Sequence, residues 1–176
     1  MDKGNIGIRI TASISCFNNK GNGKLYGQKF NRLGLNWNKI DCMKITTRIL
    51  EDELFESVNE DGHRATIDTR PRGTKAAQSP VELLLTALSA CAAVDIVMIL
   101  KKRRKTITDF KIIADGTRPE EPPRYFEKIH SHYLITSPDV EPEEVHKAAA
   151  LALEKYCSVG ASLKSELTFS VEVRRP

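Results

Sequence analysis

The stretch SPVELLLTALSACAAVDIVMIL (residues 79–100) joins a helix start to a long apolar run that holds one cysteine, Cys91. Ser79 suits an N-cap, Pro80 suits the first helical position, and Glu82 completes the pattern of a capping box. These residues predict a long helix that ends in the basic run that follows. Because the helix is apolar on nearly every side, we expect it to be buried on more than one side.

The same stretch is not typical of a membrane span, because Glu82 and Asp95 lie inside it and KKRRK (residues 101–105) follows closely. KKRRK is expected to be a solvated helix end, where cations complement the helix dipole. The N-terminus lacks the continuous apolar segment of a secretory signal. We therefore expect a cytoplasmic protein with no membrane partner.

The basic character of the chain is confined to its N-terminal part. The net charge is +4, but residues 1–42 hold seven basic residues against two acidic ones, whereas the remaining residues hold 20 against 21. The body therefore offers no basic patch typical of nucleic-acid binding. Residues 1–42 are crowded with Asn, Gly and Lys, which favour turns and disorder. We expect a flexible extension or an over-long start at 1–42, and a folded domain at 43–176.

Residues 43–176 alternate between strand and helix patterns. The expected strands are 44–50, 54–58, 63–69, 108–115, 124–136 and 168–173, with a hairpin turn at 59–62. The expected helices are 79–103, 142–156 and a short segment at 161–166. The resulting order, βββ-α-ββ-α-β, predicts an α+β domain.

Three segments carry a resemblance to a known family. P-x-E-L-L-L-x-A-L-x-x-C-x-x-x-D spans residues 80–95, PPRYFEKIHSHYLIT spans 122–136, and E-K-Y-C-S-V spans 154–159. Together they resemble the OsmC/Ohr family, especially its YhfA-like branch, from Met43 to the C-terminus. The resemblance implies the OsmC/Ohr-like fold, with antiparallel-rich sheets and two long central helices in an intertwined homodimer.

The resemblance also implies thiol peroxidase chemistry on organic hydroperoxides, with no cofactor. Cys91 would attack the peroxide and pass through a sulfenic acid, and Cys157 would condense with it to a disulfide. An external dithiol would restore the two thiols. The residues leave two alternatives open: a dimer that binds a small apolar ligand at the subunit interface, and a stress-related scaffold with inert thiols.

The surroundings of the two cysteines differ. Cys157 lies at a break between helices, where the amides of a new helix would lower its pKa. Cys91 lies on an apolar helix face, and helical spacing gives it the neighbours Leu84, Ala87, Leu88, Val94 and Met98.

Two acidic residues are candidates for pocket or orienting positions near Cys91. Glu82 lies nine residues before Cys91, where the family's peroxidases have their glutamate ten before, so we favour helix capping for Glu82. Asp95 shares the face of Cys91, either as a hydrogen-bonding or proton-handling group or as a buried partner of a basic group or backbone amide across the dimer. The family's activating arginine has no match in the acidic loop at 50–53. The candidate substitutes are Arg48, Arg64, Arg70, Arg72 and Arg124.

His130 and His132 lie two apart on a predicted strand and so share a face. No third ligand accompanies them at a recognisable spacing, so the sequence predicts no metal site. The four cysteines, at positions 16, 42, 91 and 157, form no CxxC pair and show no metal-ligand spacing either.

Overall fold

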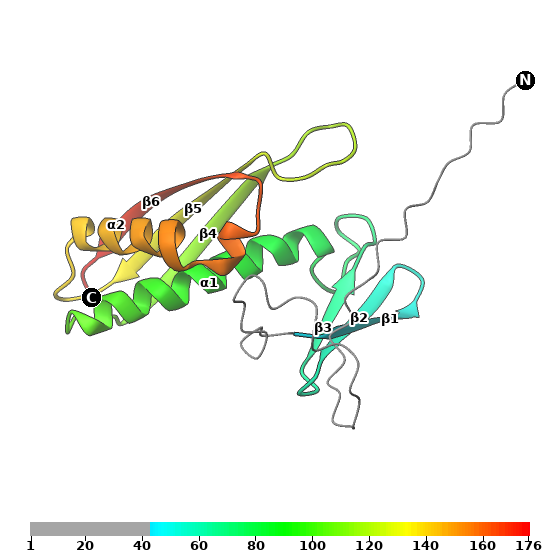
Figure 1. Cartoon of the computed structure of the whole chain (residues 1–176), viewed down its shortest axis with the longest axis horizontal. Coiled ribbons are helices and arrows are strands. Elements are labelled where there is room, and N and C mark those ends of the chain that lie inside the picture. The colour runs from blue at the N-terminus through cyan, green and yellow to red at the C-terminus, as the bar shows by residue number, and fades with distance from the viewer. Residues whose placement is uncertain (1–42) are drawn as a thin grey trace, which may run out of the picture. The chain divides into compact units, whose positions relative to one another are not determined.

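The computed structural model describes residues 43–176, and their helices and strands give an α+β fold (Figure 1). The elements in chain order are β1 (Ile45–Glu51), β2 (Leu54–Asn59), β3 (Arg64–Asp68), α1 (Pro80–Lys102), β4 (Asp109–Thr117), β5 (Lys128–Thr136), α2 (Pro142–Leu151), the π-helical turn η3 (Ala152–Tyr156), α3 (Ser158–Ala161) and β6 (Glu166–Arg174). The predicted class and the predicted order of strands and long helices are confirmed. The extension expected at 1–42 lies outside the described residues.

Strands β1, β2 and β3 form one three-stranded sheet in that order. The turn between β2 and β3 closes where the sequence predicts it, with the amide of Gly62 donating to the carbonyl of Asn59 at 3.1 Å. Gly62 has a φ of 86°, which a residue without a side chain adopts readily. All seven residues of β1 are exposed.

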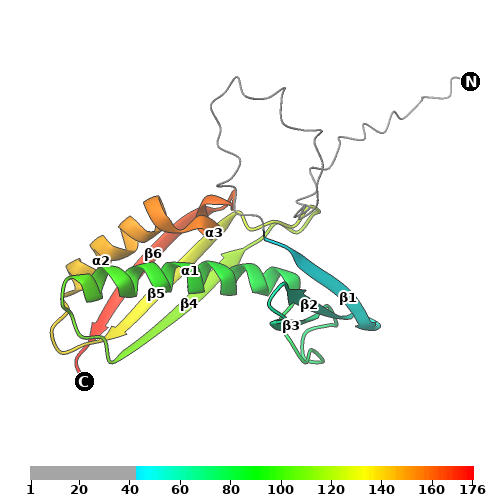
Figure 2. The same cartoon turned by 60° about the horizontal axis from the view of Figure 1, so that its bottom comes forward.

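Strands β4, β5 and β6 form the second sheet, in which β5 is central. β4 runs antiparallel to β5, whereas β6 runs parallel to it. One face of β5 is buried through Ile129, Tyr133 and Ile135. Helices α1 and α2 lie on this face, where α1 contacts β4 and α2 contacts β6 (Figure 2).

Helix α1 buries one face in this core. Its capping box forms as predicted, and its buried residues are Leu88, Ala92, Ile96 and Leu100, which follow one another at intervals of four. The opposite side is open, because Leu84 is 43% exposed, Val94 59% and Met98 50%. Residues 43–176 of one chain thus bury only one side of α1, and cover of the other side by a partner subunit stays a prediction.

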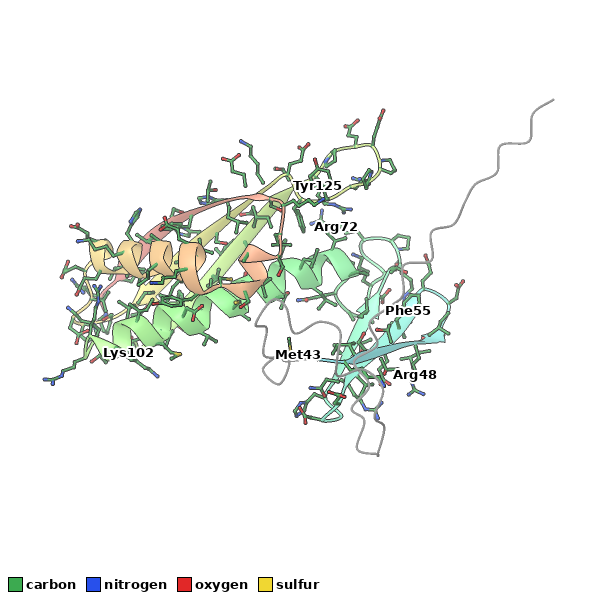
Figure 3. The ribbon with its side chains drawn as sticks, in the orientation of Figure 1. Met43, Arg48, Phe55, Arg72, Lys102 and Tyr125 are labelled. Carbon is green, nitrogen blue, oxygen red and sulfur yellow. The ribbon has the colours of Figure 1, made fainter. Side chains whose placement is uncertain are left out.

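Helix α1 is also long and apolar enough to cross a membrane, with a mean hydropathy of 2.4. The expectation that Glu82 and Asp95 exclude a span on composition is therefore wrong. Packing gives a better criterion, because Ala92, Ile96 and Leu100 belong to the main apolar core. We identify α1 as the core helix of this fold. Its basic end is solvated as predicted, and Figure 3 shows Lys102 at its C-terminal end.

The chain after α2 departs from the sequence prediction. Helix α2 passes into the π-helical turn η3, where the amide of Cys157 donates to the carbonyl of Ala152 at 2.8 Å. The short helix expected at 161–166 lies earlier, at Ser158–Ala161. The reason is that Cys157 itself is the N-cap, since its sulfur accepts a hydrogen bond from the amide of Gly160 at 3.3 Å.

Candidate functional site

Helix α1 and the N-cap of α3 bring Cys91 and Cys157 together. Cys157 is only 2% exposed, Cys91 is half-buried, and both are free thiols. Both side chains belong to one apolar cluster. The apolar cluster around them consists of Leu88, Phe126 and Ile129, with the partly buried Val81, Leu85, Leu153, Val159, Leu163 and Leu167. The two free thiols thus share one apolar environment.

Burial controls the protonation of Cys157. Burial first, and then hydrogen bonding with Cys91, raise the pKa of this thiol to about 11, although the amides of Gly160 and Val159 oppose the shift. The prediction that the helix break lowers this pKa is therefore wrong in its net direction, because desolvation outweighs the two amides. At neutral pH Cys157 is a thiol that can donate to the sulfur of Cys91.

A close approach of the backbone completes the surroundings of Cys157. A Cβ atom added at Gly160 would lie 3.5 Å from the Cys157 sulfur and 3.2 Å from Cδ1 of Leu167. The latter distance is tighter than ordinary side-chain packing, so position 160 favours a residue without a side chain. Gly160 therefore lets its own amide reach the sulfur.

Sequence reasoning missed Phe126 as part of this site. Phe126 is 7% exposed, and its ring lies over Gly116 so closely that a Cβ atom there would overlap it. The guanidinium of Arg118 lies 5.9 Å from the centre of the same ring, on the loop that also carries the exposed Tyr125 (Figure 3). The only available signal was an aromatic residue just after the paired prolines of PPRYF.

Among the described residues, four of the five candidate arginines have partners other than the thiols, and the exception is Arg72. Arg48 and Arg64 both bind Glu56, at 2.9 and 2.7 Å. Arg124 donates to a backbone carbonyl at 3.1 Å, and Arg72 is exposed. None of the groups that shift the pKa of Cys157 is a cation. Among residues 43–176, the structure shows no match for the activating arginine that the resemblance implies.

Arg70, the fifth candidate, is bound by a buried carboxylate. Asp68 is fully buried and accepts from Nη2 of Arg70 at 2.6 Å and from the amide of Ala76 at 2.7 Å. These hydrogen bonds, led by those from Arg70, hold the pKa of Asp68 well below its usual range. The acidic turn with Glu51 and Glu53 also acts on this guanidinium, because both residues raise the pKa of Arg70. Arg70 therefore stabilises the chain before α1.

The buried carboxylate of Asp68 makes the stability of the folded chain depend on pH. Because the folded state depresses the pKa of Asp68 below its ordinary 3.8, its stabilisation is present above that pH and is lost as the pH falls further. Asp68→Asn is expected to lower the free energy of unfolding most at pH 7, with a difference from wild type that shrinks below about pH 4. Urea unfolding of wild type and variant at several pH values measures the loss at pH 7 and its decrease at low pH. Asp109→Asn, at an exposed position, is the control, and equal losses in the two variants would contradict this assignment.

Glu82 has the capping role that the sequence favours. Its Oε2 accepts from the amide of Ser79 at 2.7 Å and from Nζ of Lys75 at 3.1 Å. Hydrogen bonds from Ser79, followed by that from Lys75, lower the pKa of Glu82 to about 2. Its cationic partner is thus a lysine before the helix, and none of these contacts orients an arginine.

Asp95 is half-buried and lines a surface groove of about 470 Å³ at the C-terminal half of α1. Lys102, Arg103 and Tyr156 line the same groove. Within the described part of one chain, the carboxylate has no ion-pair or hydrogen-bond partner, and a partner across a dimer stays a prediction. Partial exposure gives it solvent instead, so no buried counter-ion is needed. The proton-handling role of Asp95 stays a prediction.

A second groove, of about 430 Å³, runs between α1 and β4. Small and apolar side chains line most of it, and its residues are Leu85, Thr86, Ser89, Ala90, Ala93, Ile112 and Ala114. Leu85 also packs against the thiol cluster. The groove therefore shares one residue, Leu85, with the apolar cluster around the thiols.

Comparisons with known proteins agree with this architecture. The family model described as OsmC-like protein matches residues 73–172. Protein YhfA of Escherichia coli (strain K12) is 35% identical over 133 residues, which are 74% of this chain and 98% of that protein. A hypothetical protein from Aquifex aeolicus VF5 has a solved structure that is similar at a TM-score of 0.69 and 30% identity, covering 78% of this chain and 99% of that one.

A more distant structure shares the fold alone. The organic hydroperoxide resistance protein OhrB of Bacillus subtilis is similar at a TM-score of 0.52 and 16% identity. The match covers 76% of this chain and 98% of that chain. At this identity the similarity describes the arrangement of helices and strands.

Proposed function

This chain belongs to the OsmC-like family, and from that membership we propose that it reduces organic hydroperoxides through Cys91 and Cys157. The observation that carries the proposal is the placement of two free thiols side by side in an apolar cluster. An apolar approach favours a peroxide with an organic group over hydrogen peroxide, because the organic group leaves water when it binds.

The proposed reaction has two steps on the protein. The sulfur of Cys91 attacks the outer oxygen of the hydroperoxide, the O–O bond breaks, and the organic part leaves as an alcohol after taking up a proton. Cys157 then attacks the sulfenic sulfur of Cys91, and the hydroxyl leaves as water with the proton of the Cys157 thiol. Two thiols are oxidised to a disulfide and one peroxide is reduced. An external dithiol restores both thiols by exchange, which suits a reducing cytoplasm.

The surroundings of each sulfur favour this division of roles. Cys91 is half-buried, so an incoming peroxide can reach it from solvent. Cys157 is almost fully buried, and burial raises its pKa to about 11, so it keeps its proton until the second step. Its thiol can donate to the Cys91 sulfur and stabilise negative charge there, in place of the missing cation.

The proposal includes a homodimer whose interface covers the exposed side of α1. Leu84, Val94 and Met98 form an apolar stripe on that side, and each is at least 43% exposed. Exposed apolar surface of this kind is typical of an interface between subunits. Cys91 lies on α1 between Leu84 and Val94, so a partner subunit would also enclose the thiols.

Thiol counting tests the proposed reaction. We expect the reduced full-length protein to lose two of its four thiols when it is mixed with one equivalent of cumene hydroperoxide. Labelling with a thiol reagent in denaturant, before and after the peroxide, measures the loss. A protein that keeps all four thiols under these conditions is not a thiol peroxidase for this class of substrate.

The second candidate function is a non-peroxidatic dimer that binds a small apolar ligand. The groove between α1 and β4 favours it, because small and apolar residues line it beside the thiol cluster. Unchanged thiols together with a bound hydrophobic molecule in native mass spectrometry would support this function. Unchanged thiols with no ligand would leave the third candidate, a stress-related scaffold.

A further inference from the structure

The face of the β4–β5–β6 sheet that points away from α1 and α2 carries a continuous chain of polar side chains. Thr168 Oγ1 lies 2.9 Å from His130 Nδ1, and His130 Nε2 lies 2.9 Å from Ser170 Oγ. Ser170 Oγ lies 2.7 Å from His132 Nδ1, and His132 Nε2 lies 3.4 Å from Oε2 of Glu172. The histidines come from β5 and their partners from β6, which are adjacent strands in the sheet (Figure 2).

The hydrogens of this chain can be placed in more than one way, because each histidine ring exists as either of two tautomers. In one of these arrangements, Thr168 donates its hydroxyl hydrogen to a backbone carbonyl of β5 at 3.5 Å and accepts from Nδ1–H of His130. The contact of His132 with Glu172 likewise places a hydrogen on Nε2 of that ring. The other nitrogen of each ring then directs a lone pair at Ser170, whose hydroxyl can donate to only one of them. A cation shared between the two rings would satisfy both lone pairs.

We propose that His130 Nε2 and His132 Nδ1 together bind a divalent transition-metal ion, such as Zn²⁺ or Cu²⁺, on this face of the sheet. Both nitrogens already converge on one point, since they lie 2.9 and 2.7 Å from the same hydroxyl oxygen. Neutral imidazole suits Zn²⁺, Cu²⁺ and Ni²⁺, whereas Mg²⁺ and Ca²⁺ prefer oxygen ligands. The ion replaces the hydrogen bonds from Ser170 and bridges the rings.

The outer hydrogen bonds of both rings are those that metal-binding histidines use. A ligating histidine normally donates its second N–H to a carboxylate or another oxygen, which fixes the ring and its tautomer. Glu172 does this for His132, and Thr168 does it for His130. The ring orientations are therefore set before a metal arrives.

The site has two protein ligands and open positions. Within residues 43–176, no three His, Cys, Asp or Glu side chains converge as a metal cluster, so water or a small exogenous ligand completes the coordination. Asp115 is the cross-strand partner of His130 on β4 and adds negative charge beside the rings. The sequence predicts no metal here because it shows the histidine pair but not the serine and the carboxylate that β6 brings to it.

The histidine ring nitrogens of the full-length protein report this site directly by NMR. On titration with Zn²⁺ at pH 7.5, we expect the ¹⁵N resonances of His130 Nε2 and His132 Nδ1 to shift and to saturate at one equivalent. Those of His63 and His146 should stay unchanged. Zinc bound by the cysteines would leave these ring resonances in place, so the readout separates the two kinds of site. Unchanged resonances of His130 and His132 would overturn the proposal.

Variants test the two-ligand geometry. His130→Gln or His132→Gln should weaken Zn²⁺ binding at least tenfold, as judged from the remaining ring, because one imidazole holds the ion poorly. Glu172→Gln should weaken it about tenfold or more through the orientation of His132. His63→Gln, which removes an exposed histidine elsewhere, should bind as wild type does. Equal affinities for all four variants would contradict the proposal.

Discussion

The Cys91→Ser variant is expected to keep all of its remaining thiols when it is mixed with one equivalent of cumene hydroperoxide. A serine hydroxyl does not attack a peroxide oxygen, so no sulfenic acid forms and Cys157 has nothing to condense with. Cys157 does not replace it, because it is 2% exposed and burial raises its pKa to about 11. The thiolate is the nucleophile, and Cys157 is a thiol at neutral pH.

The Cys157→Ser variant should behave differently from Cys91→Ser. Cys91 should still react, and its sulfenic acid should persist long enough to form an adduct with dimedone, which mass spectrometry detects on the α1 peptide. Cys16→Ser and Cys42→Ser are matched controls and should lose two thiols as wild type does. If Cys91→Ser also lost two thiols, the reaction would belong to other cysteines.

The Val94→Glu variant is expected to convert a dimer into a monomer. Val94 is 59% exposed in the middle of the apolar stripe on α1, between Leu84 and Met98. Burying an unpaired carboxylate against a second copy of the same helix would cost more than such an interface gains at that position. Light scattering after size-exclusion chromatography measures the mass, which should fall from that of two chains to that of one.

A matched substitution separates this effect from a general loss of solubility or folding. Ile113 on β4 is 42% exposed, and Ile113→Glu introduces the same charge on the sheet. Ile113→Glu should leave the mass unchanged, and circular dichroism should show both variants folded. A wild-type protein that runs as one chain, or a Val94→Glu protein that runs as two, would remove the dimer from the account.

Local patterns in the sequence were sufficient for the architecture. The capping box at Ser79 and Glu82 and the hairpin turn closed by Gly62 form as predicted, because both are determined by hydrogen bonds within a few residues. The short helix near 161–166 was placed wrongly, because its true start depends on a cysteine sulfur acting as N-cap. Sulfur is a weak acceptor, so cysteine at position 157 carries little capping information.

The candidate site was only partly readable from the sequence. The two cysteine motifs identify Cys91 and Cys157, but the protonation of Cys157 depends on how deeply it is buried, which helical spacing does not give. Phe126 was missed because its place beside the thiols depends on the approach of its ring to Gly116 across the loop. The partners of Arg70 were also hidden, since Asp68 is buried only in the folded chain.

Mapping the disulfide after one turnover tests the redox pairing most directly. The full-length protein is treated with one equivalent of cumene hydroperoxide, free thiols are blocked, and the digest is analysed by mass spectrometry without reduction. The account predicts one major cross-link, between the α1 peptide with Cys91 and the peptide with Cys157, with Cys16 and Cys42 blocked as free thiols. A digest in which Cys91 and Cys157 are both recovered as blocked thiols would contradict it.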